Sequence, residues 1–136
     1  MEKHTTDELL QKPYWVIDIL PKQVPADSKG QYAAVEHYYL DRKRIFETKH
    51  RHVDLVLKLN CYMDICMDEN HVNPSPKLLA YEMLRRHMDI RIDEALLVSE
   101  PDETHLTLYN ANDGILELAR LLAQAEGLFV WQPENN

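Results

Sequence analysis

The sequence predicts an α+β fold in which about five strands form a mainly antiparallel or mixed sheet and about four helices pack mostly on one face. Short runs rich in β-branched and aromatic residues alternate with longer runs whose apolar residues recur every three or four positions. Two of the short runs flank the turn-forming segment EPDE, as in a hairpin. At 136 residues the chain is long enough for one core, so we expect a single domain over 1–136.

The first strand is predicted over 14–20, YWVIDIL, which a proline ends. A proline-rich loop follows. Ser28 and Gln31 have the spacing of a capping box, which predicts a helix that begins near Lys29. The residues expected on its inner face are Tyr32, Val35 and Tyr39.

A second helix is predicted over 42–59, either separate or continuous with the first around a bend, followed by a strand over 61–67. Its helical spacing is carried by Ile45, Phe46, Val53, Val56 and Leu57. We expect this helix to carry a basic cluster outward, namely Arg42, Lys43, Arg44, Lys49, His50, Arg51 and His52.

Ser75 before Pro76 is the typical start of a helix, here expected to reach about His87. The runs 95–99 and 104–109 should pair as an antiparallel hairpin. Asn112 can cap a last helix, Gly127 stands where a left-handed helix end is expected, and 128–131 reads as the last strand.

The net charge of −8 opposes a general attraction to nucleic acid or to an anionic membrane, and it favours a basic protein partner. No apolar run approaches the ~20 residues that span a bilayer, and the polar N-terminus lacks a secretory signal. Cys61 and Cys66, five residues apart on one predicted strand, would lie roughly 16 Å from each other. We therefore expect free thiols and a cytoplasmic protein.

Known catalytic and cofactor motifs do not fit the sequence. Three glycines are too few for a dinucleotide fingerprint or a phosphate loop. The seven histidines and two cysteines lack the spacing of a zinc site, and no serine has a nucleophile-elbow context. We expect no cofactor and no metal.

Asp18 and Asp64 each lie in the middle of an otherwise apolar predicted strand. If the two strands were neighbours, the carboxylates could form an acid/base or metal-binding pair. The alternative is that one or both mark the solvent side of a half-exposed strand. The other candidate binding residues are Trp15, Tyr39, Tyr62 and His105. Tyr and Trp favour places where one end is apolar and the other wet, but core packing is the favoured explanation of the aromatic residues.

The segments YWVIDILPKQVPADSKGQY, over 14–32, and LAQAEGLFVWQP, over 122–133, resemble the two ends of a family of small uncharacterised bacterial proteins. The resemblance implies no activity and supplies no functional residues.

Two functions of different classes follow from these observations. The preferred one is a non-enzymatic binding or regulatory protein that recognises a protein partner or forms a homo-oligomer. The negative net charge of the chain favours a basic partner. The alternative is a small enzyme or ligand-binding domain that uses Asp18 and Asp64 in a pocket lined by Tyr and Trp.

Overall fold

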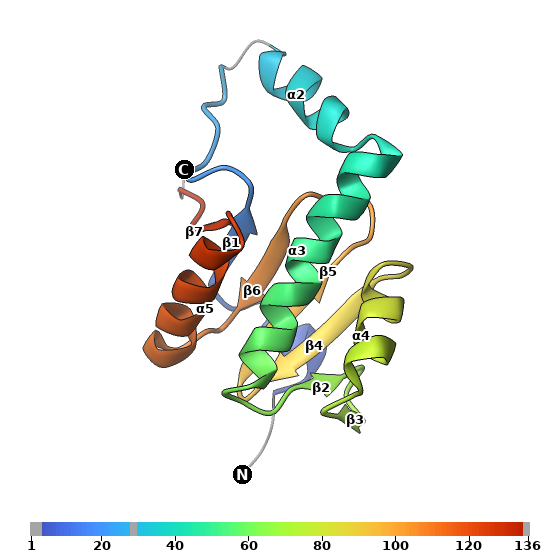
Figure 1. Ribbon diagram of the computed structural model, residues 1–136. Coiled ribbons are helices and arrows are strands. Elements are labelled where there is room, and N and C mark those ends of the chain that lie inside the picture. The colour runs from blue at the N-terminus through green and yellow to red at the C-terminus, as the bar shows by residue number, and fades with distance from the viewer. Residues whose placement is uncertain (1–3, 28–29, 135–136) are drawn as a thin grey trace.

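A seven-stranded sheet is the centre of the structure, a computed structural model that describes residues 4–27 and 30–134 (Figure 1). The strands follow the order β3-β2-β4-β5-β6-β1-β7, and each neighbouring pair is antiparallel. Their bounds are β1 Tyr14–Asp18, β2 Cys66–Met67, β3 His71–Val72, β4 Met88–Ile92, β5 Ala95–Ser99, β6 Leu106–Tyr109 and β7 Phe129–Trp131. The predicted α+β class is confirmed.

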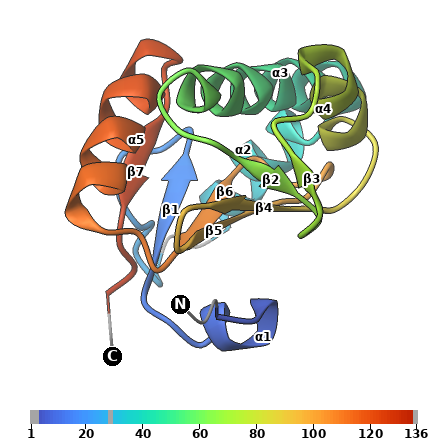
Figure 2. The ribbon, with the colours of Figure 1, turned by 90° about the horizontal axis from the view of Figure 1, so that it is seen from below.

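Three helices cover one face of the sheet, and a short one lies on the opposite face (Figure 2). The covering helices are α3 (Arg42–Asn60), α4 (Pro76–Met83) and α5 (Asp113–Ala125). Helix α1 (Thr6–Leu9) lies across the sheet from them, where Leu9 is fully buried, and α2 (Gln31–Tyr39) lies beyond one end of the sheet (Figure 1). The prediction of helices mostly on one face therefore holds for α3, α4 and α5, but not for α1 and α2.

The core forms where alternate side chains of the strands meet the three helices. The register aligns Ile90, Leu97, Leu108 and Trp15 in one row across β4, β5, β6 and β1. Because successive strand residues point to opposite faces, such a row lies on one side of the sheet. A fully buried Leu or Ile contributes about 1.5–3 kcal/mol relative to exposure, so these rows fix the register.

Three helix boundaries predicted from capping residues are confirmed, namely the starts of α4 and α5 and the end of α5. Ser75 Oγ accepts a hydrogen bond from the backbone N–H of Leu78 at 3.2 Å, at the start of α4. Asn112 Oδ1 accepts one from Ile115 at 2.8 Å, at the start of α5. Gly127 follows α5 at φ +74°, a left-handed conformation that glycine adopts without steric cost.

The predicted strand over 61–67 is mostly wrong. Helix α3 reaches Asn60, and the N–H groups of Tyr62 and Met63 still bond to the carbonyl of Leu59, so CYM extends a helical turn. Only Cys66–Met67 is a strand. Both cysteines are free, as expected, although they do not share a strand.

The sequence reading also missed β4, β3 and α1. Helix α4 ends at Met83 rather than near His87, and the alternating segment Met88–Ile92 follows as a central strand. The first strand ends at Asp18, before the predicted limit of residue 20. Among the described residues, no helix is both long and apolar enough to cross a bilayer.

Helix α2 differs most from its prediction. Tyr32, Val35 and Tyr39 were expected on an inner face, but the helix buries none of its nine residues. Gly30 is the N-cap of this helix, and no side chain caps it there; the predicted cap Ser28 lies outside the described residues.

Candidate functional site

A group of buried polar side chains lies between α3 and the end of the β5–β6 hairpin. We call this group, Lys49, His52, Ser99 and Thr104, the polar cluster. Lys49 is 1% exposed, and His52 and Ser99 are fully buried. The expectation that α3 carries its whole basic cluster outward is therefore wrong for Lys49 and His52.

The periodicity of α3 places both basic residues inside. Its buried positions are Thr48, Lys49, His52, Val53, Leu55, Val56 and Leu59, which form one helical stripe. From the sheet, Ser99 belongs to a row with Met88, Leu106 and Ile17 that faces the helices. The sequence carried this signal, because Lys49 and His52 keep the three-to-four residue spacing from Ile45 to Val56.

The ammonium of Lys49 is the central charge of the polar cluster. Its Nζ donates a hydrogen bond to Ser99 Oγ at 2.8 Å. Burial lowers the pKa of Lys49 to about 8, although the carboxylates of Glu103, Glu100 and Asp102 act in the opposite direction. The hairpin end thus surrounds a buried lysine with negative charge.

His52 is the neutral member of the polar cluster. Its pKa lies well below the ordinary value, first because the ring is buried and second because Lys49 is close. Among the described residues neither ring nitrogen meets the full geometry of a hydrogen bond, although the nearby Thr104 backbone acts against the lowering of the pKa. A buried imidazole in this state costs stability, since an unmet buried polar group costs about 1–3 kcal/mol.

Asp18 and His105 lie on neighbouring segments, on the sheet face opposite to that of Ile17, Leu106 and Ser99. The β1–β6 register, continued by one residue beyond Ile17 and Leu106, places them opposite each other. Burial raises the pKa of Asp18, against the opposing effects of the Ile19 N–H, which donates to its Oδ1 at 2.7 Å, and of His105. Asp18 is therefore a buried carboxyl and does not mark the solvent side of its strand.

The remaining predicted binding residues lie elsewhere. Asp64 is exposed in the turn before β2 and accepts a hydrogen bond from Asn73 at 2.9 Å. Three strands separate β1 from β2, or about 19 Å at about 4.8 Å per strand, so Asp18 and Asp64 form no pair.

In the described part of the chain the three predicted aromatic residues lie on different elements. Tyr62 is exposed in the turn after α3, and Tyr39 is exposed at the end of α2. Trp15 lies on the helix-covered face of β1, in the row of Leu108. The predicted Tyr/Trp-lined pocket is therefore not assembled from these residues.

Lys49 and Ser99 have the composition of a serine–lysine catalytic pair, in which a lysine of lowered pKa takes the proton of a nucleophilic hydroxyl. Their burial argues against this chemistry. Ser99 points toward α3 from the covered face of the sheet, and a fully buried hydroxyl offers a substrate no access. The polar cluster is thus part of the protein interior.

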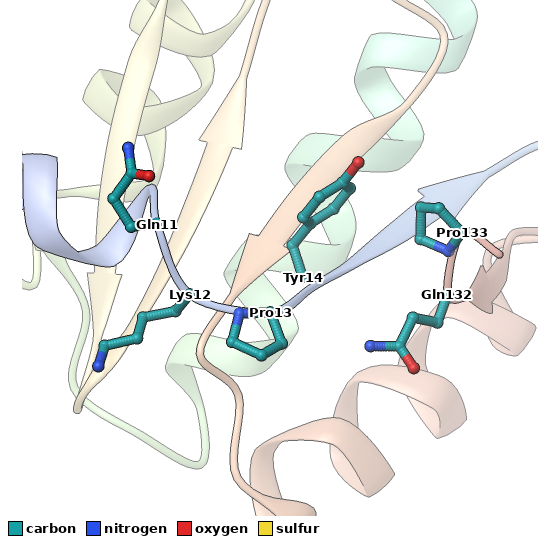
Figure 3. Close-up of a pocket in the computed structure, with 6 residues that line it drawn as sticks. All are labelled: Gln11, Lys12, Pro13, Tyr14, Gln132 and Pro133. Carbon is teal, nitrogen blue, oxygen red and sulfur yellow. The ribbon is translucent and has the colours of Figure 1, made fainter. Parts of the chain in front are cut away.

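Two hollows near the N-terminal segment are lined by polar residues. Figure 3 shows the first, of about 320 Å³, lined by Gln11, Lys12, Pro13, Tyr14, Gln132 and Pro133. It contains no carboxylate and no histidine. The second, of about 280 Å³, is lined by His4, Thr5, Cys66, Glu69, Arg91 and Asp93. In the described part of the chain, no three His, Cys, Asp or Glu side chains are grouped to hold a metal ion.

A larger unusual surface lies on α2 and the first turns of α3, residues 31–47, which we call the arm. Its exposed apolar residues are Tyr32, Val35, Tyr38, Tyr39, Leu40 and Phe46. Tyr38 contacts the ring of Tyr39 edge-on at 5.3 Å, and the guanidinium of Arg44 lies 3.8 Å from its ring centre. Tyr and Arg are the residue types enriched at interface hot spots.

Comparison of the chain with known protein families, with curated protein sequences and with solved structures gives no match. The resemblance of the two chain ends to a bacterial family stays a prediction.

Proposed function

We propose that this protein is a non-enzymatic binding protein and that the arm is its contact surface for another protein. One observation carries the proposal: α2 displays four large aromatic or aliphatic side chains, Tyr32, Val35, Tyr38 and Tyr39, and buries nothing. Contiguous exposed apolar surface of this kind is typical of interaction sites.

Helix physics supports the same reading. Isolated helices shorter than about 12–15 residues are marginal in water, and most helices in proteins are stabilised by packing an apolar face. Helix α2 has nine residues and no buried face, so packing against the rest of the chain stabilises it little. A partner that covers Tyr38 and Tyr39 would supply the missing packing.

The test compares two tyrosines in matched settings. Tyr38 is 53% exposed and Tyr81 on α4 is 54% exposed, and each has an arginine guanidinium 3.8 Å from its ring centre. The tagged protein and its Tyr38→Ala and Tyr81→Ala variants are used to capture proteins from the source cell, and each captured protein is purified and rebound. We expect a protein that the wild type and Tyr81→Ala bind and that Tyr38→Ala binds at least about tenfold more weakly. Equal binding by all three chains contradicts the proposal.

A basic partner is the second candidate, and the net charge of −8 favours it. The arm contains three acidic and three basic residues, so this charge lies on the rest of the chain. A basic protein would therefore bind outside the arm, would be insensitive to Tyr38→Ala, and would be released by salt because screening weakens exposed charge pairs. The enzymatic alternative has lost its carboxylate pair.

A further inference from the structure

We infer that the partner of the arm is a second copy of this chain, bound arm to arm about a twofold axis. The inference rests on the proposed function, since it names the occupant of the same surface. It is argued from the charge, the unpaired side chains and the area of the arm.

The distribution of charge limits how two copies can approach. Residues 31–47 carry Glu36, Asp41 and Glu47 against Arg42, Lys43 and Arg44, a balance of 3 − 3 = 0. The rest of the chain therefore carries −8 − 0 = −8. Two such bodies repel each other, whereas two neutral arms do not, and α2 holds the contact beyond the end of the sheet (Figure 1).

The charges at the start of α3 are arranged to complement themselves. Arg44 already pairs with Asp41, at 3.3 Å, and stacks on Tyr38. Arg42, Lys43 and Glu47 have no ion-pair partner within the described ranges. In a twofold contact each patch meets its own copy, so the basic pair of one chain can lie against Glu47 of the other.

The shape of the arm provides both a projection and a hollow. One hollow of about 650 Å³ is lined by Asp41, Arg42, Lys43, Phe46 and Glu47. Phe46 is 51% exposed and forms part of the wall of this hollow, and its ring centre lies 4.6 Å from that of His50 in an edge-on arrangement. A self-complementary interface needs these two features on one surface, because each copy must offer what the other accepts.

The area available is that of a small, reversible dimer. The four aromatic rings of the arm are 37–53% exposed, which leaves roughly 80 Å² each if a whole aromatic side chain buries about 200 Å². With Val35 and Leu40 the apolar area is roughly 450 Å² per copy, or about 900 Å² for both. The charged residues of α3 bring the total near the lower end of specific interfaces, about 1,200 Å². We therefore expect concentration-dependent dimerisation.

Sedimentation velocity with the purified full chain tests the inference. Over a broad concentration series the mass should rise from 16.0 kDa toward twice that value. Raising the salt from about 0.05 to about 0.5 M should strengthen the dimer severalfold, because screening the repulsion between two chains of net charge −8 outweighs the weakening of a few exposed charge pairs at the contact. Tyr38→Ala or Phe46→Ala should weaken it about tenfold, and Tyr81→Ala should leave it unchanged.

A wild-type chain that stays monomeric throughout the series overturns the inference, as does a dimer that Tyr38→Ala and Tyr81→Ala weaken equally. Circular dichroism of the variants verifies that each is folded. The proposed function is judged separately: a monomeric chain that captures a different protein through Tyr38 refutes the dimer and leaves the arm as a binding surface.

Discussion

Replacing the buried lysine with methionine should change how stability depends on pH. The ordinary pKa of lysine is 10.5, and burial lowers that of Lys49 to about 8, a difference worth about 3 kcal/mol. Below about pH 8 both the folded and the unfolded chain carry the proton, so the folded state bears this full cost. Between about pH 8 and 10.5 only the unfolded chain binds the proton, so stability rises with pH.

From about pH 7.5 to about pH 9.5 the contribution of Lys49 to the free energy of unfolding should rise by about 2 kcal/mol. Lys49→Met keeps an unbranched side chain, one atom shorter, and removes the titrating group, so this rise should disappear. Urea unfolding followed by tryptophan fluorescence measures it, as a midpoint shift on the order of 1 M.

Lys58→Met is the control, because Lys58 is an exposed lysine on the same helix whose pKa is raised by a hydrogen bond from its ammonium to Glu126. It should keep the wild-type rise across this pH range. Equal pH dependence in the wild type and in Lys49→Met would refute the assignment of a lowered pKa to Lys49.

Three other changes follow from the same structure. Burial and Lys49 lower the pKa of His52, so as the pH falls below 6.5 the unfolded chain takes up a proton before the folded chain does. The free energy of unfolding of the wild type should then fall by up to about 1.4 kcal/mol per pH unit. His52→Leu should lose less stability between about pH 6.5 and 5.5 in urea unfolding, and an unchanged slope would count against this prediction. Asn112→Ala removes the cap of α5 and should cost about 1 kcal/mol in thermal unfolding, whereas no loss would mean that the cap is not formed. Gly127→Ala should cost about 1 kcal/mol by the same assay. The added Cβ would lie at an ordinary 3.5 Å from Arg51 Nη1, so the cost comes from backbone strain at φ +74°. A neutral result would exclude this strain.

Local chemistry predicted the parts of the fold that depend on neighbouring residues. Ser75, Asn112 and Gly127 mark helix ends through hydrogen bonds or backbone angles that span three or four residues, and each prediction is confirmed. The EPDE turn likewise joins two antiparallel strands. The segment 61–67 failed because CYM can continue a helix, and the preceding helix decides its conformation.

The candidate site depends on long-range contacts, which explains why it was only partly predicted. Strand order separates Asp18 from Asp64, and no sequence period encodes strand order. The burial of Lys49 follows from its helical stripe, but a lysine within a basic run is ordinarily assigned to the surface. The exposure of α2 was not predicted because its tyrosines have the spacing of a buried helix face, although the sheet and the other helices do not pack against them.

Helix α3 carries Lys49 and His52 of the polar cluster as well as the last part of the arm, and this connects a buried lysine to the proposed binding surface. Lys49 lies less than one helical turn after the arm ends, and its bond to Ser99 fixes that part of α3 on the hairpin. A methionine would pack there without a buried charge. We therefore expect Lys49 to fix the orientation of α3 on the hairpin rather than to add stability, a role attested for some buried polar groups. Lys49→Met should therefore remain folded at neutral pH yet weaken the arm-to-arm dimer severalfold in sedimentation. If the dimer is unchanged while the pH dependence is lost, the polar cluster does not orient the arm.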